Sequence, residues 1–206
     1  IAVTGTNGKS SIADFYYQIL DLNKKKVASI GTLGIKSKKF KKNLSNTTID
    51  PIQLSIILSN LKKQNINNVI MEASSHGLSQ NRLDGLFFNT GIFTNLSQDH
   101  MDYHKNMKDY LKAKTYLFEQ LIKKNGNIIT DEKISEYKQI KKIASNKNLN
   151  LFSLLDKKNN FQFLSHQFEN EAQLLKIKYN NSIHNIKLNL IGKVQLKNIL
   201  MATIAA

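Results

Sequence analysis

The chain opens with the ten residues Ile-Ala-Val-Thr-Gly-Thr-Asn-Gly-Lys-Ser, which run from Ile1 to Ser10. The apolar start predicts a buried strand, and the amphipathic pattern that follows predicts a helix. A loop with two glycines between a strand and a helix can turn its backbone N–H groups toward an oxyanion, at the positive end of the helix dipole. This segment therefore predicts a loop that binds the phosphates of a nucleoside triphosphate.

The residues of this loop have distinct expected roles. Gly5 and Gly8 give the backbone its freedom, Lys9 can reach the outer phosphates, and the Ser10 hydroxyl can join the ligands of Mg²⁺. The match to the general phosphate-loop pattern is incomplete, because the first glycine of that pattern would fall on Val3. The alternative interpretation is an ordinary glycine turn before a helix.

Beyond this loop, the chain alternates apolar strands with amphipathic helices. Strands are expected over residues 1–4, 26–30, 69–73, 90–96, 127–130 and 149–153, and helices over 9–22, 52–64, 107–123 and 132–146. Asp50 and Pro51 supply an N-cap and a first-turn proline for the second of these helices. Repeated strand–helix units predict an α/β fold of the P-loop type, with a doubly wound, mostly parallel sheet flanked by helices and a site at the carboxyl ends of the strands.

Two segments depart from this alternation of strands and helices. Residues 174–179 and 183–188 alternate apolar and polar side chains around Asn180-Asn181, which predicts an antiparallel hairpin appended to the sheet. The lysine-rich run 36–42 is expected to be a solvated loop. Since no linker separates these parts, residues 1–206 are expected to form one domain.

The composition limits the possible partners and compartments. The 206 residues include no cysteine, which excludes disulfides and thiolate metal sites, and 41% of them are hydrophobic. No apolar run reaches the roughly 18–20 residues that a membrane span needs. The net charge of +15 is spread along the chain without interleaved aromatic side chains, so we expect no nucleic-acid partner. These observations favour a soluble cytoplasmic protein with no membrane partner.

Candidate metal ligands follow two of the expected strands. Glu72 comes after strand 69–71, and the run Asp99-His100-Met101-Asp102-Tyr103-His104 comes after strand 92–95. The carboxyl ends of parallel strands meet at one edge of a sheet, so both should lie near the phosphate loop, where carboxylate oxygen suits Mg²⁺. For the second cluster, the alternative is a turn that caps the next helix.

Arg82 is the only arginine among 30 basic residues. A planar guanidinium can bind a carboxylate or phosphate through two parallel hydrogen bonds, so Arg82 is a candidate ligand for an anionic substrate. His166 and His184 lie in the region of the hairpin and are expected to be structural or exposed.

Five motifs taken together resemble a known family. They are Thr4-Gly5-Thr6-Asn7-Gly8-Lys9-Ser10, Asn46-Thr47-Thr48-Ile49-Asp50-Pro51, Glu72-Ala73-Ser74-Ser75-His76-Gly77-Leu78, Phe93-Thr94-Asn95-Leu96-Ser97-Gln98-Asp99-His100-Met101-Asp102-Tyr103-His104 and Ala113-Lys114-Thr115-Tyr116-Leu117-Phe118. Their order and spacing resemble the Mur ligases, and the third and fourth look like the branch that adds a diamino acid to UDP-N-acetylmuramoyl-L-alanyl-D-glutamate. The resemblance spans residues 1–206 as the central, ATP-binding domain and implies separate amino- and carboxy-terminal domains. The start at Ile1 rather than Met, and the end at Ala206 inside an expected helix, likewise suggest a part of a longer protein.

The resemblance implies ATP and Mg²⁺ as cofactors, together with the residues that hold them. ATP would lie on Gly5, Thr6, Asn7, Gly8, Lys9, Ser10 and Ser11, with Asn198 at the adenine. The implied metal ligands are Ser10, Glu72, His100 and Lys114, and the implied catalytic residues are Lys9, His100 and Lys114. Lys114 matches a lysine that the family carbamylates with CO₂, whereas a helix lysine without this resemblance would be read as solvated. Gln195 stands where the family usually has Asn, which leaves its adenine contact open.

The resemblance also implies the substrates and the reaction. A UDP-linked muramoyl dipeptide would lie on Asn46, Thr47, Thr48, Ser74, Gln80 and Arg82. A diamino acid, meso-2,6-diaminopimelate in preference to L-lysine, would be joined to it through an acyl phosphate by a monomeric cytoplasmic enzyme. The alternatives are a ligase of the folylpolyglutamate or cyanophycin synthetase kind, and a phosphate-loop module that binds nucleic acid.

Overall fold

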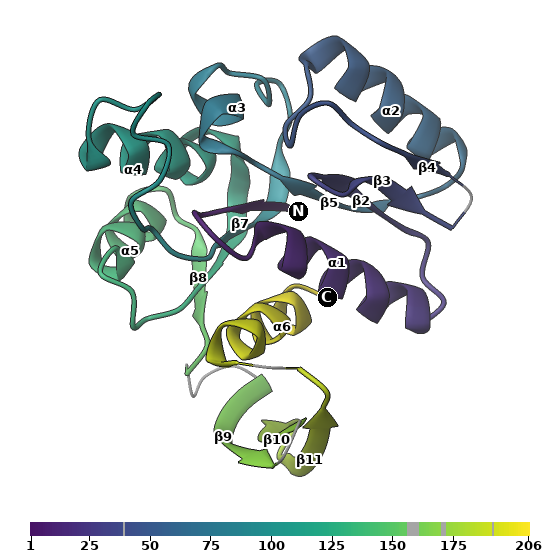
Figure 1. The fold of residues 1–206 in the computed structure, drawn as a ribbon, viewed down its shortest axis with the longest axis vertical. Helices are drawn as coiled ribbons and strands as arrows, with labels where there is room; N and C mark the ends of the chain where they lie inside the picture. The colour runs from purple at the N-terminus through teal and green to yellow at the C-terminus, as the bar shows by residue number, and fades with distance from the viewer. Residues whose placement is uncertain (39, 156–160, 170–171, 191) are drawn as a thin grey trace.

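The computed structural model describes residues 1–38, 40–155, 161–169, 172–190 and 192–206. Within these residues, one sheet of eight strands runs in the order β4-β3-β2-β5-β1-β6-β7-β8 (Figure 1). The strands are β1 (Ala2–Thr4), β2 (Val27–Gly31), β3 (Gly34–Ser37), β4 (Lys41–Lys42), β5 (Asn68–Glu72), β6 (Phe88–Phe93), β7 (Ile122–Thr130) and β8 (Asn150–Ser153). Pairing is parallel from β2 through β8 and antiparallel at the β3–β4 edge. The predicted doubly wound, mostly parallel sheet is confirmed.

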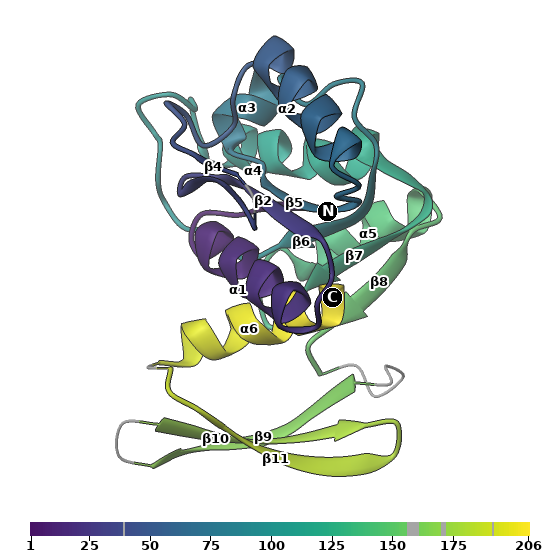
Figure 2. The same ribbon diagram turned by 90° about the vertical axis from the view of Figure 1, so that its right-hand side faces the viewer.

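Helices cover both faces of this sheet (Figures 1 and 2). On one face lie α1 (Lys9–Leu22) and α6 (Lys193–Ala205); on the other lie α2 (Pro51–Lys63), α3 (Ser75–Ser79), α4 (Met107–Tyr116), the π-helix η1 (Leu117–Leu121) and α5 (Tyr137–Asn146). The predicted cap of α2 is confirmed, because the Asp50 side chain accepts a hydrogen bond from the backbone N–H of Gln53 and Pro51 occupies the first turn. None of the helices in the described residues has the length and apolar character of a membrane-spanning segment.

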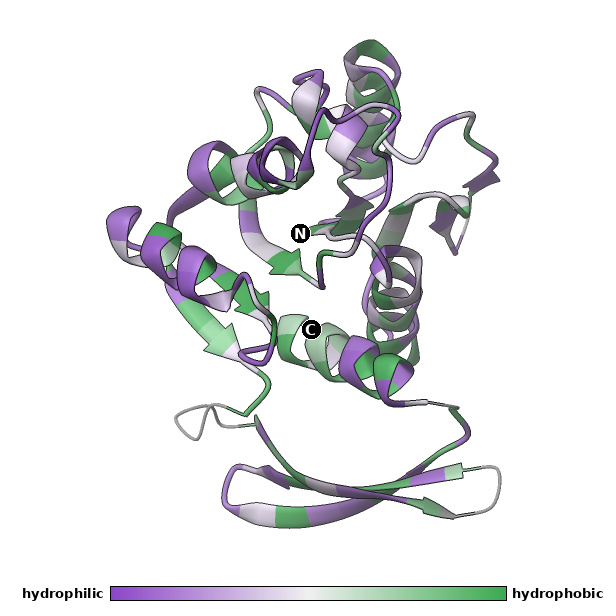
Figure 3. Cartoon of the chain, turned by 60° about the vertical axis from the view of Figure 1, so that its left-hand side comes forward, coloured by the Kyte–Doolittle hydropathy of each residue, from purple (hydrophilic) through white to green (hydrophobic). Residues whose placement is uncertain are grey.

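Each central strand contributes to two cores, because successive residues point to opposite faces of the sheet. On β6, Ile92 belongs to the core shared with α1 and α6, whereas Phe93 belongs to the core shared with α2 and α5. The residues of β6 are buried from Thr90 to Phe93, as is typical of a parallel sheet covered on both faces. In Figure 3 the surrounding helices alternate between hydrophilic and hydrophobic residues, as helices with one solvated face do.

A second, antiparallel sheet lies beyond α6 and contains β9 (Phe161–Glu169), β10 (Ala172–Tyr179) and β11 (Ser182–Leu188). The predicted hairpin is confirmed as β10 and β11, joined by Asn180 and Asn181 with φ angles of 45° and 67°. The strand β9 was absent from the prediction. Its pairing with β10 shifts register at Lys176/Ile177, and such a bulge interrupts the period-two pattern by which a strand is predicted.

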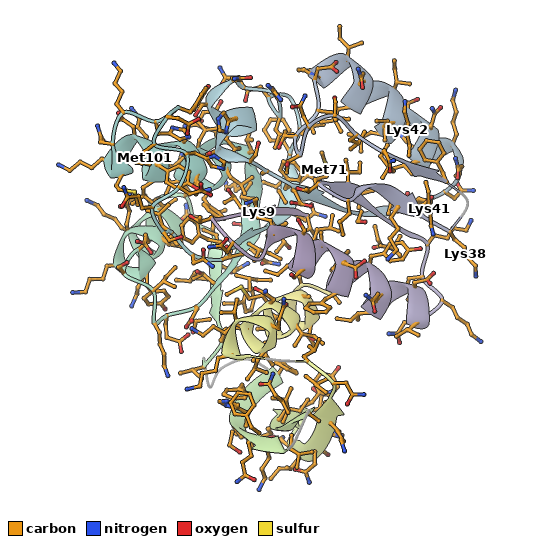
Figure 4. The ribbon with its side chains drawn as sticks, in the orientation of Figure 1. Lys9, Lys38, Lys41, Lys42, Met71 and Met101 are labelled. Carbon is orange, nitrogen blue, oxygen red and sulfur yellow. The ribbon has the colours of Figure 1, made fainter. Side chains whose placement is uncertain are left out.

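The run 36–42 is exposed at Lys38, Phe40, Lys41 and Lys42, as predicted, but it is not a loop throughout, because β3 ends and β4 lies within it. Ser37 ends β3 and its hydroxyl donates to the carbonyl of Phe40, and Lys41 and Lys42 form β4. Figure 4 shows Lys38, Lys41 and Lys42 together at this edge of the molecule. Lysines protect an exposed edge strand from pairing with other chains, so a lysine-rich run is compatible with a short edge strand.

Two predicted helices have different limits in the structure. The helix expected over residues 107–123 ends at Tyr116; the buried Leu117, Phe118 and Leu121 form η1, and the chain enters β7 at Ile122. The apolar spacing of these side chains fits a helix, and packing against the sheet determines where it ends. The helix expected from residue 132 begins at Tyr137, because the Asp131 carboxylate accepts a hydrogen bond from the Lys133 N–H and holds the preceding residues in a turn.

Candidate functional site

The predicted phosphate loop lies at the carboxyl end of β1, in the middle of the sheet. β1 has β5 on one side and β6 on the other, so the direction of strand addition reverses at this point. Crevices at such switch points are where open α/β sheets bind ligands. An open hollow of ≈ 340 Å³ occupies the position and is lined by Thr6, Asn7, Gly8, Lys9, Ser10, Ser11, Thr32, Thr47, Glu72, Ser74 and His100.

The end of β6 holds the loop in place. The Thr6 N–H donates to the Asn95 carbonyl, the Asn7 N–H donates to the Asn95 side chain, and the Thr94 hydroxyl donates to the Asn7 carbonyl at 2.6 Å. A Cβ on Gly5, whose φ is +142°, would lie 1.8 Å from the Thr94 hydroxyl oxygen. Only glycine allows this close approach, which explains its place in the loop.

Lys9 binds its own loop. Its ammonium donates to the carbonyls of Gly5 at 3.0 Å and Thr6 at 2.8 Å. Burial lowers the pKa of Lys9, against the opposing attraction of Glu72 and Asp99. Figure 4 shows Lys9 near the centre of the molecule at the start of α1, and Lys9 is among the residues that line the hollow.

Lys114 lies inside the protein, so the interpretation of it as a solvated helix lysine is wrong. Its side chain is 1% exposed, donates to the Gly5 carbonyl at 2.8 Å, and lies 4.2 Å above the ring of Tyr110. Tyr110 and Lys114 are four residues apart on α4 and share the face turned toward the loop. Burial, and next the charge of Lys9, lower the pKa of Lys114 to about 7.

Glu72 and Ser10 together form an oxygen-rich corner of the hollow. Glu72 is 2% exposed, and its Oε2 accepts a hydrogen bond from the Ser10 hydroxyl at 2.9 Å. Because the only proton of the Ser10 hydroxyl points at the carboxylate, its lone pairs are free to face a cation. Hard oxygen donors of this type fit Mg²⁺.

His100 borders the same hollow on the 99–104 loop. It has a left-handed φ of 52°, lies 3.5 Å from the Asp99 carboxylate, and meets the ring of His76 edge-on at 4.9 Å. In the part of the chain that is described, no three His, Asp or Glu side chains gather closely enough to hold a metal by themselves. The alternative of a helix-capping turn does not apply to this cluster, because Asn106 caps α4 by accepting from the Asp109 N–H.

The predicted substrate residues form a second group beside the hollow. The buried Thr48 hydroxyl accepts hydrogen bonds from the N–H and hydroxyl of Ser74 and donates to the Glu72 carbonyl. Arg82 donates to the Thr48 carbonyl through Nη1 and to the Gln80 side chain through Nε and Nη2. Thr47 is half-buried near Thr32, and Asn46 is exposed with a side-chain contact to Ser45.

Asn198 reaches the phosphate loop from α6. It is 3% exposed, and a Cβ on Gly8 would lie 2.6 Å from its Oδ1. Its Nδ2 donates to the side chain of Gln195 at 3.2 Å, so Gln195 supports Asn198. Ser11, half-buried at the start of α1, also lines the hollow.

Sequence reasoning missed Thr32 and Tyr110, and it named His104 only as a member of the 99–104 cluster. Tyr110 is fully buried and its hydroxyl lies 3.2 Å from that of Thr6; His104 is buried against the Tyr110 ring at 4.9 Å. The turn between Gly31 and Gly34 was the signal that could have pointed to Thr32. Of the remaining histidines, His184 is exposed on β11 and His166 lies between Phe163 and Phe168 on β9, as predicted.

Known proteins share both the sequence and the fold. The UDP-N-acetylmuramoyl-L-alanyl-D-glutamate–2,6-diaminopimelate ligase of Zymomonas mobilis is 36% identical over 201 residues, which cover 98% of this chain and 41% of that protein. A solved structure of a ligase of the same name superposes with a TM-score of 0.85 at 27% identity, over 99% of this chain and 42% of the other. Folylpolyglutamate synthase of Mycobacterium tuberculosis, solved with ADP, shares the fold with a TM-score of 0.75 at 13% identity, over 98% of this chain and 52% of that one.

The chain thus spans less than half the length of the diaminopimelate ligases that it matches. The Mur ligase middle domain matches residues 3–206, which include the phosphate loop, Glu72, His100, Lys114 and Asn198. The chain therefore belongs to the Mur ligase middle domain family.

Proposed function

We propose that this chain is the central, ATP-binding domain of a ligase that joins meso-2,6-diaminopimelate to UDP-N-acetylmuramoyl-L-alanyl-D-glutamate in peptidoglycan precursor synthesis. One observation carries the proposal. A phosphate loop, the buried Lys114 and the Glu72 carboxylate meet at the switch point of the sheet. This arrangement occurs in a chain that is 36% identical to a ligase of that name.

Two displacement steps account for the reaction. A carboxylate oxygen of the dipeptide attacks the γ-phosphorus of ATP, the bond from this phosphorus to the β–γ bridging oxygen breaks, and ADP leaves behind an acyl phosphate. The amine of the diamino acid then attacks the acyl carbon, loses a proton to solvent and displaces inorganic phosphate. In both steps negative charge builds up on oxygen and leaves on a phosphate group, so the protein must mainly position the reactants and neutralise charge.

Lys9 is the residue that would neutralise the transferring phosphate. Its ammonium now binds two neutral carbonyls of the loop. A charge-assisted bond to a phosphate oxygen is stronger than a bond to a carbonyl, so ATP would draw the same nitrogen away from Gly5 and Thr6. The backbone N–H groups at the start of α1 would hold the β-phosphate.

Ser10, Glu72 and His100 are the residues that would hold one Mg²⁺, and Lys114 would hold a second. When bound, the metal neutralises charge on the β- and γ-phosphates. Lys114 would take part as an anion, since an ammonium would repel the cation and Mg²⁺ prefers oxygen ligands to a neutral amine. Its pKa of about 7 leaves a large neutral fraction at pH 7, and a neutral amine can attack CO₂, form an N–C bond and release a proton to give a carbamate.

Arg82 would bind the acyl substrate together with Asn46, Thr47, Thr48, Ser74 and Gln80. Three of its five N–H donors are used by Thr48 and Gln80, which leaves one free on each Nη nitrogen. A carboxylate would accept from these two remaining donors. Arg82 is therefore both held in place and available to a dipeptide carboxylate.

We place the enzyme in the cytoplasm, where ATP and UDP-linked precursors are made, as a monomer with no nucleic-acid or membrane partner. The folylpolyglutamate alternative has support at the level of the fold alone.

The proposal is tested with the complete protein that carries this chain. With the UDP-linked dipeptide, ATP and Mg²⁺, it should form amide, ADP and phosphate in equal amounts with meso-2,6-diaminopimelate, and far less with L-lysine or L-glutamate. Lys9→Ala should lower kcat about 100-fold or more, as the loss of a preorganised charge does. Lys25→Ala, at an exposed position after α1, is the matched control and should turn over normally. Near-normal turnover of Lys9→Ala would contradict the proposal, as would a product formed only with glutamate.

A further inference from the structure

Thr32 lies outside all the motifs of the chain, yet it binds both oxygens of Glu72. It is the first residue of the two-residue turn between β2 and β3. Its backbone N–H donates to Glu72 Oε1 at 2.9 Å, and its hydroxyl donates to Oε2 at 3.1 Å. Two donors from one residue fix the rotation of the carboxylate plane.

Gly31, the residue before Thr32, allows the Glu72 carboxylate to come close enough for these hydrogen bonds. A Cβ at this position would lie 2.1 Å from Glu72 Oε1, so the carboxylate rests directly on the backbone of the turn. With the Ser10 hydroxyl also bound to Oε2, both carboxylate oxygens have a defined direction. The end of β2 and the turn after it therefore fix the direction in which the Glu72 carboxylate points.

The Thr32 hydroxyl also meets the segment proposed to bind the acyl substrate. Its oxygen lies 3.0 Å from the hydroxyl oxygen of Thr47. A hydroxyl has one proton, and that of Thr32 points at the Glu72 carboxylate, which can only accept. The hydroxyl of Thr47 must then donate to Thr32, which gives a chain of hydrogen bonds from Thr47 through Thr32 to Glu72.

We propose that Thr32 is a positioning residue that orients Glu72 toward Mg²⁺ and couples the metal to the acyl substrate through Thr47. The inference rests on the proposed function of Glu72 and Thr47. When a ligand fixes Thr47, it also fixes the donor to Thr32 and, through it, the direction of the Glu72 carboxylate. Metal and acyl substrate should therefore strengthen each other's binding, and the effect must be reciprocal.

The same chain specifies the chemistry that Thr47 offers to its ligand. Because its proton is committed to Thr32, Thr47 presents acceptor lone pairs to the hollow. A peptide N–H, rather than a carbonyl, is the group that would bind there.

The experiment measures Mn²⁺ binding by the complete protein with ADP present, from the electron paramagnetic resonance signal of the free ion. Titrations are made with and without the UDP-linked dipeptide. Thr32→Val keeps the shape and the backbone N–H but removes the hydroxyl, Thr32→Ser keeps the hydroxyl, and Leu33→Ala changes an exposed neighbour in the same turn. Thermal unfolding checks that each variant is folded, and Thr32→Ala replaces Thr32→Val if the latter is not.

In the wild type, the dipeptide should lower the Kd for Mn²⁺. Thr32→Val should raise the Kd about 10-fold, the usual effect of removing a partner of a metal ligand, and should abolish the influence of the dipeptide. Thr32→Ser should restore both properties, and Leu33→Ala should match the wild type. Wild-type affinity and dipeptide dependence in folded Thr32→Val would overturn the inference, as would a wild type whose Mn²⁺ affinity ignores the dipeptide. Failure of the wild type to bind Mn²⁺ with ADP at all would instead refute the proposed function.

Discussion

At the scale of single residues, the Gly5 carbonyl accepts hydrogen bonds from two lysines, Lys9 at 3.0 Å and Lys114 at 2.8 Å. A neutral oxygen cannot offset two ammonium charges. Burial lowers the pKa of both amines, and the charge of Lys9 lowers that of Lys114 further. Two amines at one neutral carbonyl would stabilise negative charge close to them. Nucleotide phosphates and a carbamate on Lys114 would both supply that charge.

The pKa of Lys114 predicts a dependence of stability on pH. The folded-state pKa is about 7, below the usual 10.5, so between these pH values the unfolded chain holds a proton that the folded chain lacks. Folding is therefore favoured as pH rises through this window and disfavoured below it. Relative to Lys114→Met, which cannot titrate, the unfolding free energy of the wild type should rise by up to about 1.4 kcal/mol per pH unit.

Urea unfolding of both complete proteins between pH 7 and pH 10, in buffer depleted of CO₂, measures this difference. Carbon dioxide must be removed because a carbamate would replace the titrating amine. Parallel curves for the two proteins would show that the buried amine keeps an ordinary pKa.

The roles of individual residues were only partly predictable from the sequence. The glycines of the phosphate loop, Ser10 and Glu72 could be predicted because the strand–loop–helix pattern fixes where their atoms lie. Lys114 could not be placed by its own pattern, since a helix period shows which residues share a face but not what that face contacts. Thr32 had no signal beyond its turn, because its bonds to Glu72 join residues 40 positions apart.

At the scale of elements, the contact between α6 and the start of α1 positions the phosphate loop. Asn198 of α6 lies against Gly8, which has a φ of +90°. Gly8→Ala would combine left-handed strain with a Cβ 2.6 Å from the Asn198 side chain. Gly85→Ala is the matched control, because Gly85 has a φ of +85° but open space around its Cβ.

Gly85→Ala should lose only the roughly 1 kcal/mol of left-handed strain. Gly8→Ala should lose more stability and also bind ADP at least about 10-fold more weakly, since α6 and the loop must separate. Urea unfolding and calorimetric titration with ADP distinguish the two effects. Equal losses of stability in the two variants, with unchanged ADP affinity, would show that α6 does not hold the phosphate loop in place.

Most of the elements could be predicted because their patterns are local. The limits of α1, residues 9–22, agree with the prediction, since the glycine before Lys9 starts the helix and Asn23 ends its apolar period. The edge strands β3 and β4 and the end of α4 could not be predicted in this way. β3 pairs with β2 and β4 pairs with β3, and these strands are too short to show a residue pattern of their own. The end of α4 is set by the packing of η1 on the sheet.

At the scale of the whole molecule, the site is an open hollow at the carboxyl ends of the central strands. The phosphate loop and Glu72 line this hollow, and Lys114 contacts the loop from α4 through the Gly5 carbonyl. The diaminopimelate ligase of Zymomonas mobilis is more than twice as long as the part that this chain matches, since the match covers 41% of it. We therefore expect residues 1–206 to hold the nucleotide but not to complete the reaction.

This expectation is tested with residues 1–206 produced alone and shown to be folded by circular dichroism. Calorimetry should detect ADP binding in the presence of Mg²⁺, at least about 10-fold weaker than in the complete protein, because a one-sided site leaves the nucleotide exposed to water. Lys9→Ala in the same segment should remove this binding, since it removes the charge that meets the phosphates. Supplied with ATP, the UDP-linked dipeptide and diaminopimelate, the segment should form no amide.

Two results would contradict this expectation. A product from the segment alone would place the site for the diamino acid within residues 1–206. A segment that is folded but does not bind ADP would show that the phosphate loop needs a second domain to hold nucleotide.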